Sequence, residues 1–213
     1  MERLVSKPVK DTYGRYVGFV VGFSVDTSGD LTSIGVDQGN GVFTEYPSER
    51  LVSAPDGLVV IPSWKVDCES LGKEMDGVRK RAKALQELAK EGQVPKTLFE
   101  EMMGRYGEEA ERTRESYKTL GEEMLVRTQE LDLQRESLER FLVNIKVQYR
   151  SGEIDESSFK LASECCQAMQ EKNSQERQEL GRMLKLVTEP LETQSSNSAG
   201  RGQVQTVSQT AGQ

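Results

Sequence analysis

The sequence predicts an α+β protein, with a small N-terminal all-β domain, a long antiparallel helical coiled coil and a disordered tail. Residues 1–63 alternate short apolar segments with glycine-rich turns, as small β-domains do. Residues 64–190 carry apolar side chains at alternating spacings of four and three, as coiled coils do. Residues 191–213 are mainly Ser, Gln, Thr and Gly, a composition too polar to fold alone.

Short strands separated by turns are expected in the first domain. The predicted strands are Tyr16–Val25, Ile34–Asp37, Val42–Tyr46, Leu51–Ser53 and Leu58–Ile61. Gln38-Gly39-Asn40-Gly41 is expected to form a hairpin turn, because Asn and Gly adopt positive φ at little cost. This spacing is typical of a small barrel or curled sheet. The glycines do not form a phosphate-binding motif that opens a helix, so we interpret them as turn and packing residues.

Three helices are expected, at about residues 64–90, 95–149 and 155–187. Gly92 and Pro95 separate the first helix from the second. Gly152, followed by the N-cap residue Asp155, separates the second helix from the third. Pro190 is expected to end the third helix. The two breaks are similar in sequence and predict the corners of two helical hairpins.

The heptad pattern predicts a self-association seam along these helices. Its residues are Leu71, Met75, Val78, Leu85, Phe99, Met103, Tyr117, Leu120, Met124, Leu131, Leu138, Phe141, Ile145, Phe159, Leu180 and Met183. Arg127 and Gln134 also fall on the seam, where polar residues usually fix register or oligomer state. Asn173 and Glu176 make the centre of the third helix polar, which predicts weaker pairing there.

The helix lengths predict an elongated rod. The second helix would span roughly 80 Å, and the first and third, at about 40 and 50 Å, would fold back along its two halves. Two helices in cross-section leave apolar surface uncovered, which favours a homo-oligomer or filament. The alternative is a monomeric three-helix bundle.

The composition argues against an enzyme and against a cofactor or metal site. The chain has no histidine, the commonest general base and neutral metal ligand. Cys165 and Cys166 point about 100° apart on a helix, so they cannot chelate a metal together. We therefore predict no catalytic, cofactor-binding or metal-binding residues.

Charge and hydropathy limit the partners. The net charge of -7 gives no support to DNA binding or to direct attraction by anionic lipid. The basic cluster at residues 79–83 is expected to be a solvated helix face. No apolar run is long enough for a signal peptide or membrane helix, so we expect a cytoplasmic protein that meets membranes only through a partner.

The arrangement resembles the CdvA family of archaeal cell-division proteins. The resemblance lies in Leu4–Ile61, where residues 11–20 (DTYGRYVGFV) look like the opening of a PRC barrel, in the corner at residues 147–155 (VQYRSGEID), and in the polar tail. It implies assembly at the mid-cell division site, filaments that include DNA, and recruitment of an ESCRT-III-like partner, CdvB. In that family a C-terminal segment binds the partner by strand addition, which would assign Val204, Thr206 and Val207 to this contact. A plain disordered tail remains open.

These observations predict a self-assembling scaffold of archaeal cell division that recruits an ESCRT-III-like protein. The alternative is a nucleic-acid-associated PRC-barrel protein that serves ribosome maturation or chromosome organisation. Tight binding of duplex DNA or RNA with a steep salt dependence would favour the alternative.

Overall fold

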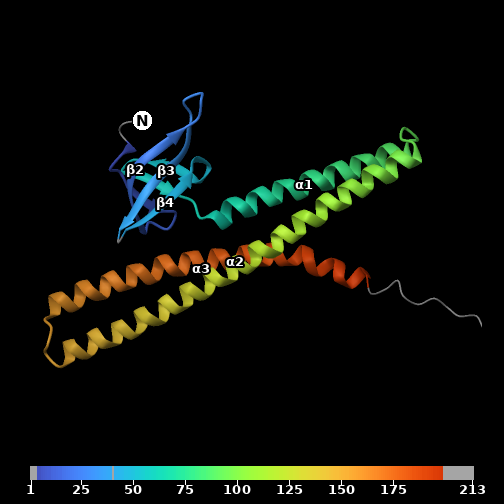
Figure 1. The fold of residues 1–213 in the computed structure, drawn as a ribbon. Helices are drawn as coiled ribbons and strands as arrows, with labels where there is room; N and C mark the ends of the chain where they lie inside the picture. The colour runs from blue at the N-terminus through green and yellow to red at the C-terminus, as the bar shows by residue number, and fades with distance from the viewer. Residues whose placement is uncertain (1–3, 40, 199–213) are drawn as a thin grey trace, which may run out of the picture.

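The computed structural model describes residues 4–39 and 41–198 of the chain. An N-terminal six-stranded sheet is followed by three long helices, α1 (Ser63–Lys90), α2 (Lys96–Arg150) and α3 (Glu156–Ser198) (Figure 1). The predicted fold class is therefore confirmed. The tail residues Val204, Thr206 and Val207 lie outside the described residues.

The sheet is mixed, with one parallel pair. Its strands are β1 (Pro8–Asp11), β2 (Tyr16–Val25), β3 (Leu31–Gly39), β4 (Val42–Pro47), β5 (Leu51–Ala54) and β6 (Gly57–Val60), in the order β4-β3-β2-β1-β6-β5. Only β1 and β6 run parallel. The bounds of β2 match the prediction, whereas β1 was not predicted, because it is short and half of it is Pro and Asp, residues that strands usually avoid.

The sheet curls without closing. Its two edge strands, β4 and β5, are consecutive in the chain and joined only by the 3₁₀ turn Ser48–Arg50, so they meet at one end. Among the described residues they form no ladder, and the comparison with a barrel is therefore approximate. The concave side holds a small core of Val9, Val20, Ile34, Val36, Tyr46, Leu58 and Val60.

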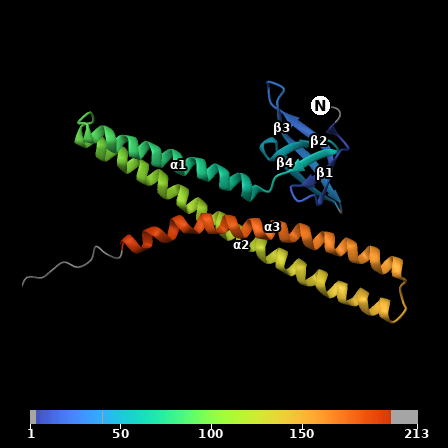
Figure 2. The same cartoon turned by 180° about the vertical axis from the view of Figure 1, so that it is seen from behind.

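The helices form two hairpins that share α2. α1 folds back along the first half of α2, and α3 folds back along the second half and crosses α2 near its middle (Figures 1 and 2). Each hairpin corner contains a left-handed glycine just past the helix end, Gly92 with φ 73° and Gly152 with φ 78°. The three helices meet in a common core of Trp64, Cys68, Leu120, Met124, Leu131, Leu180 and Val187.

The prediction that Pro190 ends the third helix is wrong, because α3 continues to Ser198. A proline removes one helical hydrogen bond and disturbs the turn before it. The neighbouring Glu189, Leu191 and Glu192 are strong helix formers and favour continuation. The region assigned to the tail therefore begins with helix.

Candidate functional site at the junction of sheet and helices

The predicted seam lies mostly inside the chain, between α1 and α2 and between α2 and α3. Met75, Val78, Leu85, Leu120, Met124, Leu131, Ile145 and Leu180 are buried. Leu71, Phe99, Met103, Tyr117, Leu138, Phe159 and Met183 are half-buried. These residues hold the two hairpins together, and their part in contacts between copies stays a prediction.

Phe141 is the exception, with 54% of its surface exposed. A straight helix drifts about 20° per heptad from a strict 3.5-residue repeat. Along α2 this drift turns Gln134 and Phe141 toward solvent, while Leu131 and Ile145 stay buried against α3. Phe141 is therefore not covered within the chain, and its part in contacts between copies stays a prediction.

A second apolar face lies on the opposite side of α2. Leu131 is 1% exposed and Leu133 is 64% exposed, and two residues are about 200° apart around a helix. Other exposed apolar residues share the side of Leu133. We call this set the outer stripe, and it consists of Leu125, Val126, Leu133, Val143 and Val147. The sequence analysis did not predict the outer stripe, because a continuous heptad pattern was already assigned to the other face of the helix.

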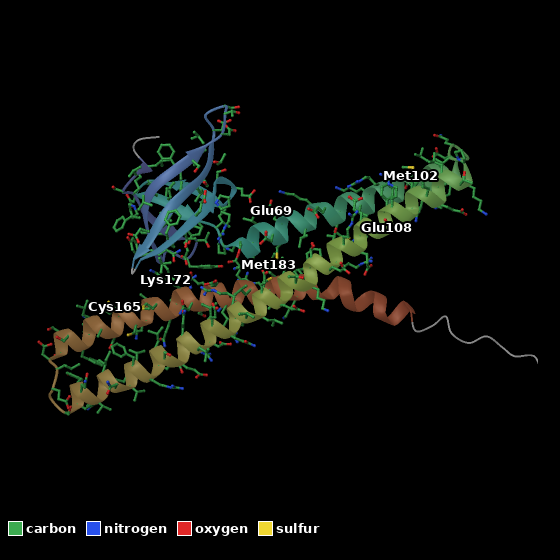
Figure 3. The ribbon with its side chains drawn as sticks, viewed as in Figure 1. Glu69, Met102, Glu108, Cys165, Lys172 and Met183 are labelled. Carbon is green, nitrogen blue, oxygen red and sulfur yellow. The ribbon has the colours of Figure 1, made fainter. Side chains whose placement is uncertain are left out.

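The turn between β1 and β2 joins the sheet to α3. Asp11 shapes this turn, because its Oδ1 accepts hydrogen bonds from the backbone N–H groups of Tyr13 and Arg15, each at 2.9 Å. Arg15 Nη1 then donates to Asn173 Oδ1 at 3.0 Å, and Lys172 Nζ on α3 donates to the carbonyl of Gly14 at 2.9 Å. Figure 3 labels Lys172 where α3 passes the sheet.

Glu176 is the centre of the junction. Its side chain is 3% exposed and accepts hydrogen bonds from Arg15 Nη2, from Arg127 Nε at 2.9 Å and from Arg127 Nη2 at 3.1 Å. Burial alone raises the pKa of this carboxyl, but the hydrogen bonds from Arg127 and Arg15 outweigh burial and leave the pKa below its ordinary value. Glu176 is therefore charged at neutral pH and ties the sheet, α2 and α3 together.

Polar residues on the two seams pair with each other. Arg127 of α2 binds Glu176 of α3, and Gln134 Oε1 accepts a hydrogen bond from Asn173 Nδ2 at 3.1 Å. Pairing at another register would leave the buried Asn173 and Glu176 unmatched, which fits the register role expected of Arg127 and Gln134. The polar residues at the centre of α3 are thus each paired with a polar residue of α2.

Glu179 provides a second link. Its Oε2 accepts a hydrogen bond from Tyr13 Oη at 2.7 Å and lies 2.7 Å from Lys65 Nζ of α1. Burial and the neighbouring Glu179 raise the pKa of the Tyr13 hydroxyl. Lys65 also lies 4.9 Å from the centre of the Tyr13 ring. The turn at Tyr13 therefore contacts both outer helices.

Comparison with known proteins identifies the coiled coil. Residues 63–210 match the family described as the CdvA-like coiled-coil domain. This chain belongs to the CdvA-like family. Cell division protein A of Sulfolobus acidocaldarius is 28% identical over 184 residues, which cover 86% of this chain and 77% of that relative. The family and this relative together support a role in cell division.

The match to the CdvA-like domain begins at the first residue of α1, so the sheet lies outside it. The alignment with the relative covers more of the chain than residues 63–210 do and therefore extends into the sheet. Among residues 4–39 and 41–198, no group of His, Cys, Asp and Glu is placed to hold a metal ion. No helix in the same part of the chain is long and apolar enough to span a membrane.

Sequence reasoning missed the junction of this CdvA-like chain as a site. It noted the segment that contains Tyr13 and Arg15 only as an opening of the β-domain, and it noted Arg127, Asn173 and Glu176 only as polar seam residues. The signal was available, because these three residues are among the four polar residues named above that break otherwise apolar seams. Which groups meet depends on long-range packing that residue spacing does not give.

Proposed function

We propose that this CdvA-like chain is a self-assembling scaffold of archaeal cell division, which acts at mid-cell and recruits an ESCRT-III-like partner. The observation that carries the proposal is the outer stripe of α2, whose five apolar side chains are each 52–64% exposed. Exposed apolar side chains that recur along one side of a charged helix favour a protein contact. A scaffold without a catalytic step fits this arrangement.

A second copy of the same stripe is the partner proposed for this face. The stripe extends roughly 33 Å along the far half of α2. Glu136 and Arg140 lie on the same side of α2, between Leu133 and Val143, and form an ion pair of 3.4 Å within the helix. In an antiparallel pair of α2 helices, the acidic and basic groups of one copy lie near those of the other. The contact would therefore combine apolar burial with charge complementarity.

Recruitment is assigned to the C-terminal tail. Val204, Thr206 and Val207 would add as a short strand to the edge of a sheet in the ESCRT-III-like partner. The β-domain and the outer stripe stay available for self-assembly while the tail binds. The two activities should therefore be separable by deletion of residues 199–213.

Sedimentation velocity over a range of concentrations tests self-assembly. Leu133→Glu should weaken association by at least about tenfold, because it places a charge in an apolar contact. Leu161→Glu is the matched control, since Leu161 is equally exposed (65%) but lies on α3, outside the stripe. A wild-type protein that is monomeric at every concentration, or equal effects of the two variants, would contradict the proposal.

Pull-down with the ESCRT-III-like partner tests recruitment. Deletion of residues 199–213 should abolish partner binding and leave the sedimentation profile unchanged. Partner binding by the truncated chain would show that the contact lies elsewhere.

A further inference from the structure

The convex face of the sheet, opposite its core, carries exposed aromatic side chains. Tyr16 and Phe19 of β2 and Phe43 of β4 are 56%, 51% and 63% exposed, so the helices leave this face uncovered. The rings of Tyr16 and Phe19 meet edge to face, with their centres 5.4 Å apart. Apolar side chains grouped on a protein surface favour contact with a partner. This face is separate from the outer stripe of α2.

An acidic residue lies between the two phenylalanines. The strand register places Asp37 of β3 directly opposite Phe19 on one side and Phe43 on the other. Directly opposite residues project from the same face of a sheet, with Cβ atoms about 5 Å apart. Val36, the neighbour of Asp37 in β3, is buried in the core, so Asp37 and both phenylalanines project from the convex face. The carboxylate is therefore flanked by an aromatic side chain on each side.

The ring of Phe43 is held against the sheet. Residue 35 of β3 is glycine, and a Cβ atom there would lie 2.7 Å from the Phe43 ring and 3.6 Å from Val21. The ring therefore occupies space that a larger residue at position 35 would fill. A ring that is already in place loses little conformational freedom when a partner binds, which favours binding.

Asp37 is available to a ligand. Its Oδ1 accepts a hydrogen bond from the backbone N–H of Gly39 at 2.8 Å, and in the described part of the chain no lysine or arginine forms an ion pair with it. Desolvation and the charge of Asp37 raise the pKa of the Tyr16 hydroxyl, so Tyr16 lies near this carboxylate as well. The second carboxylate oxygen of Asp37 can therefore accept a hydrogen bond from a partner.

The charges of the convex face favour a cation. Glu45, directly opposite Gly35, adds a second exposed carboxylate, which accepts a hydrogen bond from Ser33. Lys10 is a cation of the same face, because it lies opposite Tyr16, but its strand β1 is two strands away from that of Asp37. The surroundings of the two phenylalanines are therefore negatively charged.

Two other occupants fit this face less well. A second copy packed face to face would bring the carboxylates of the two copies together, and like charges removed from water repel each other. An apolar partner would bury Asp37 without a counter-charge, which is costly. A cationic side chain instead pairs with Asp37 and is attracted to the faces of the neighbouring rings. Arginine fits both tasks, because its planar guanidinium stacks on aromatic rings and donates to carboxylates.

We propose that the convex face of the sheet binds an arginine side chain of a partner protein. The guanidinium lies above β3, donates to Asp37 and contacts the rings of Phe19 and Phe43. Apolar residues beside the arginine in the partner contact Tyr16 and Val21. This contact uses neither the outer stripe nor the tail, so it holds a further protein through the β-domain whatever the outcome for self-assembly.

Two short peptides test the site. Full-length protein is titrated with acetyl-Leu-Arg-Leu-amide and with the same peptide in which citrulline replaces arginine, and saturation-transfer difference NMR measures binding. Citrulline keeps the shape of arginine without its charge. The arginine peptide should bind saturably and at least about tenfold more tightly than the citrulline peptide. The proposal is overturned if no saturable binding occurs or if the two peptides bind equally.

Variants assign the binding to this face. Asp37→Asn should weaken binding of the arginine peptide by about tenfold, and it keeps the oxygen that accepts from Gly39, so the turn is preserved. Phe43→Leu should weaken binding by about threefold, because it removes an aromatic ring but keeps an apolar side chain. Asp56→Asn, in the turn between β5 and β6, is the control and should bind as the wild type does. Unchanged affinity in Asp37→Asn, or an equal loss in Asp56→Asn, would contradict the assignment.

Sedimentation velocity of the same variants separates a partner protein from a second copy. Asp37→Asn and Phe43→Leu should leave the self-association of the pure protein unchanged. A change of self-association in both variants would show that this face joins copies of the chain, and the assignment to a partner protein would then be wrong.

Discussion

The two hairpins share α2 but are held together differently. In the near hairpin, α1 contributes an apolar series of Trp64, Cys68, Met75, Val78 and Leu85, all buried. In the far hairpin, α3 contributes apolar residues and also buried Asn173 and Glu176, each matched by a polar group of α2. The sheet contacts α3 at these same two residues. Polar positions in a heptad seam can therefore mark the place where another domain docks.

The exposed ion pairs between helices are similar in the two hairpins. Arg81 of α1 lies 3.4 Å from Glu109 of α2, and Arg177 of α3 lies 2.6 Å from Asp132 of α2. These pairs are partly exposed, so each contributes at most about 1 kcal/mol. The difference between the hairpins therefore rests on their buried residues.

The largest expected effect comes from a charge in the apolar part of the far hairpin. Leu180 is 0% exposed, and Leu180→Asp should lower the free energy of unfolding by more than about 4 kcal/mol, because it buries an unpaired carboxylate and loses apolar contacts. Circular dichroism during urea titration measures this change.

Leu186→Asp is the control for that experiment. Leu186 lies on the same helix and is 60% exposed, so its substitution should change stability by less than about 0.5 kcal/mol. Equal effects at Leu180 and Leu186 would contradict the packing of α3 described above.

A smaller effect is expected at the polar centre. Glu176→Ala should cost about 2–3 kcal/mol, toward the low end for a broken buried ion pair, because Arg15 and Arg127 keep part of their hydration. It should also loosen the sheet, which faster proteolysis near residues 61–63 would report. Glu171→Ala, at an exposed position of the same helix, should leave both measurements unchanged. Unaltered proteolysis in Glu176→Ala would contradict the role of Glu176 in docking.

The smallest effect is a pH dependence. The folded-state pKa of Glu176 lies below its ordinary value, so its contribution to stability is complete above that value, about 4.3. This contribution to stability is lost as the pH falls through the folded-state pKa of Glu176. The stability difference between wild type and Glu176→Gln should therefore be constant from about pH 6 to 7 and shrink toward zero in acid. A difference independent of pH would contradict the ion pairs of Glu176.

Local patterns predicted much of this structure. The strand Tyr16–Val25, the hairpin corners at Gly92 and Gly152, and most of the buried seam follow from turn residues and from periodicities of 2 and 3.5. The predicted end of α3 at Pro190 was wrong, because the continuation of a helix past one proline depends on packing and on neighbouring residues. The junction at Glu176 was not predicted, since it joins residues that lie far apart in the chain.

The 55 continuous residues of α2 give this molecule a fixed dimension. A straight helix of that length measures about 80 Å, and hairpin partners along both halves stiffen it. Copies joined through its two ends would repeat along a fibre axis at no more than this distance. The length of α2 would then limit the distance between neighbouring copies, and with it the distance between partners bound to them.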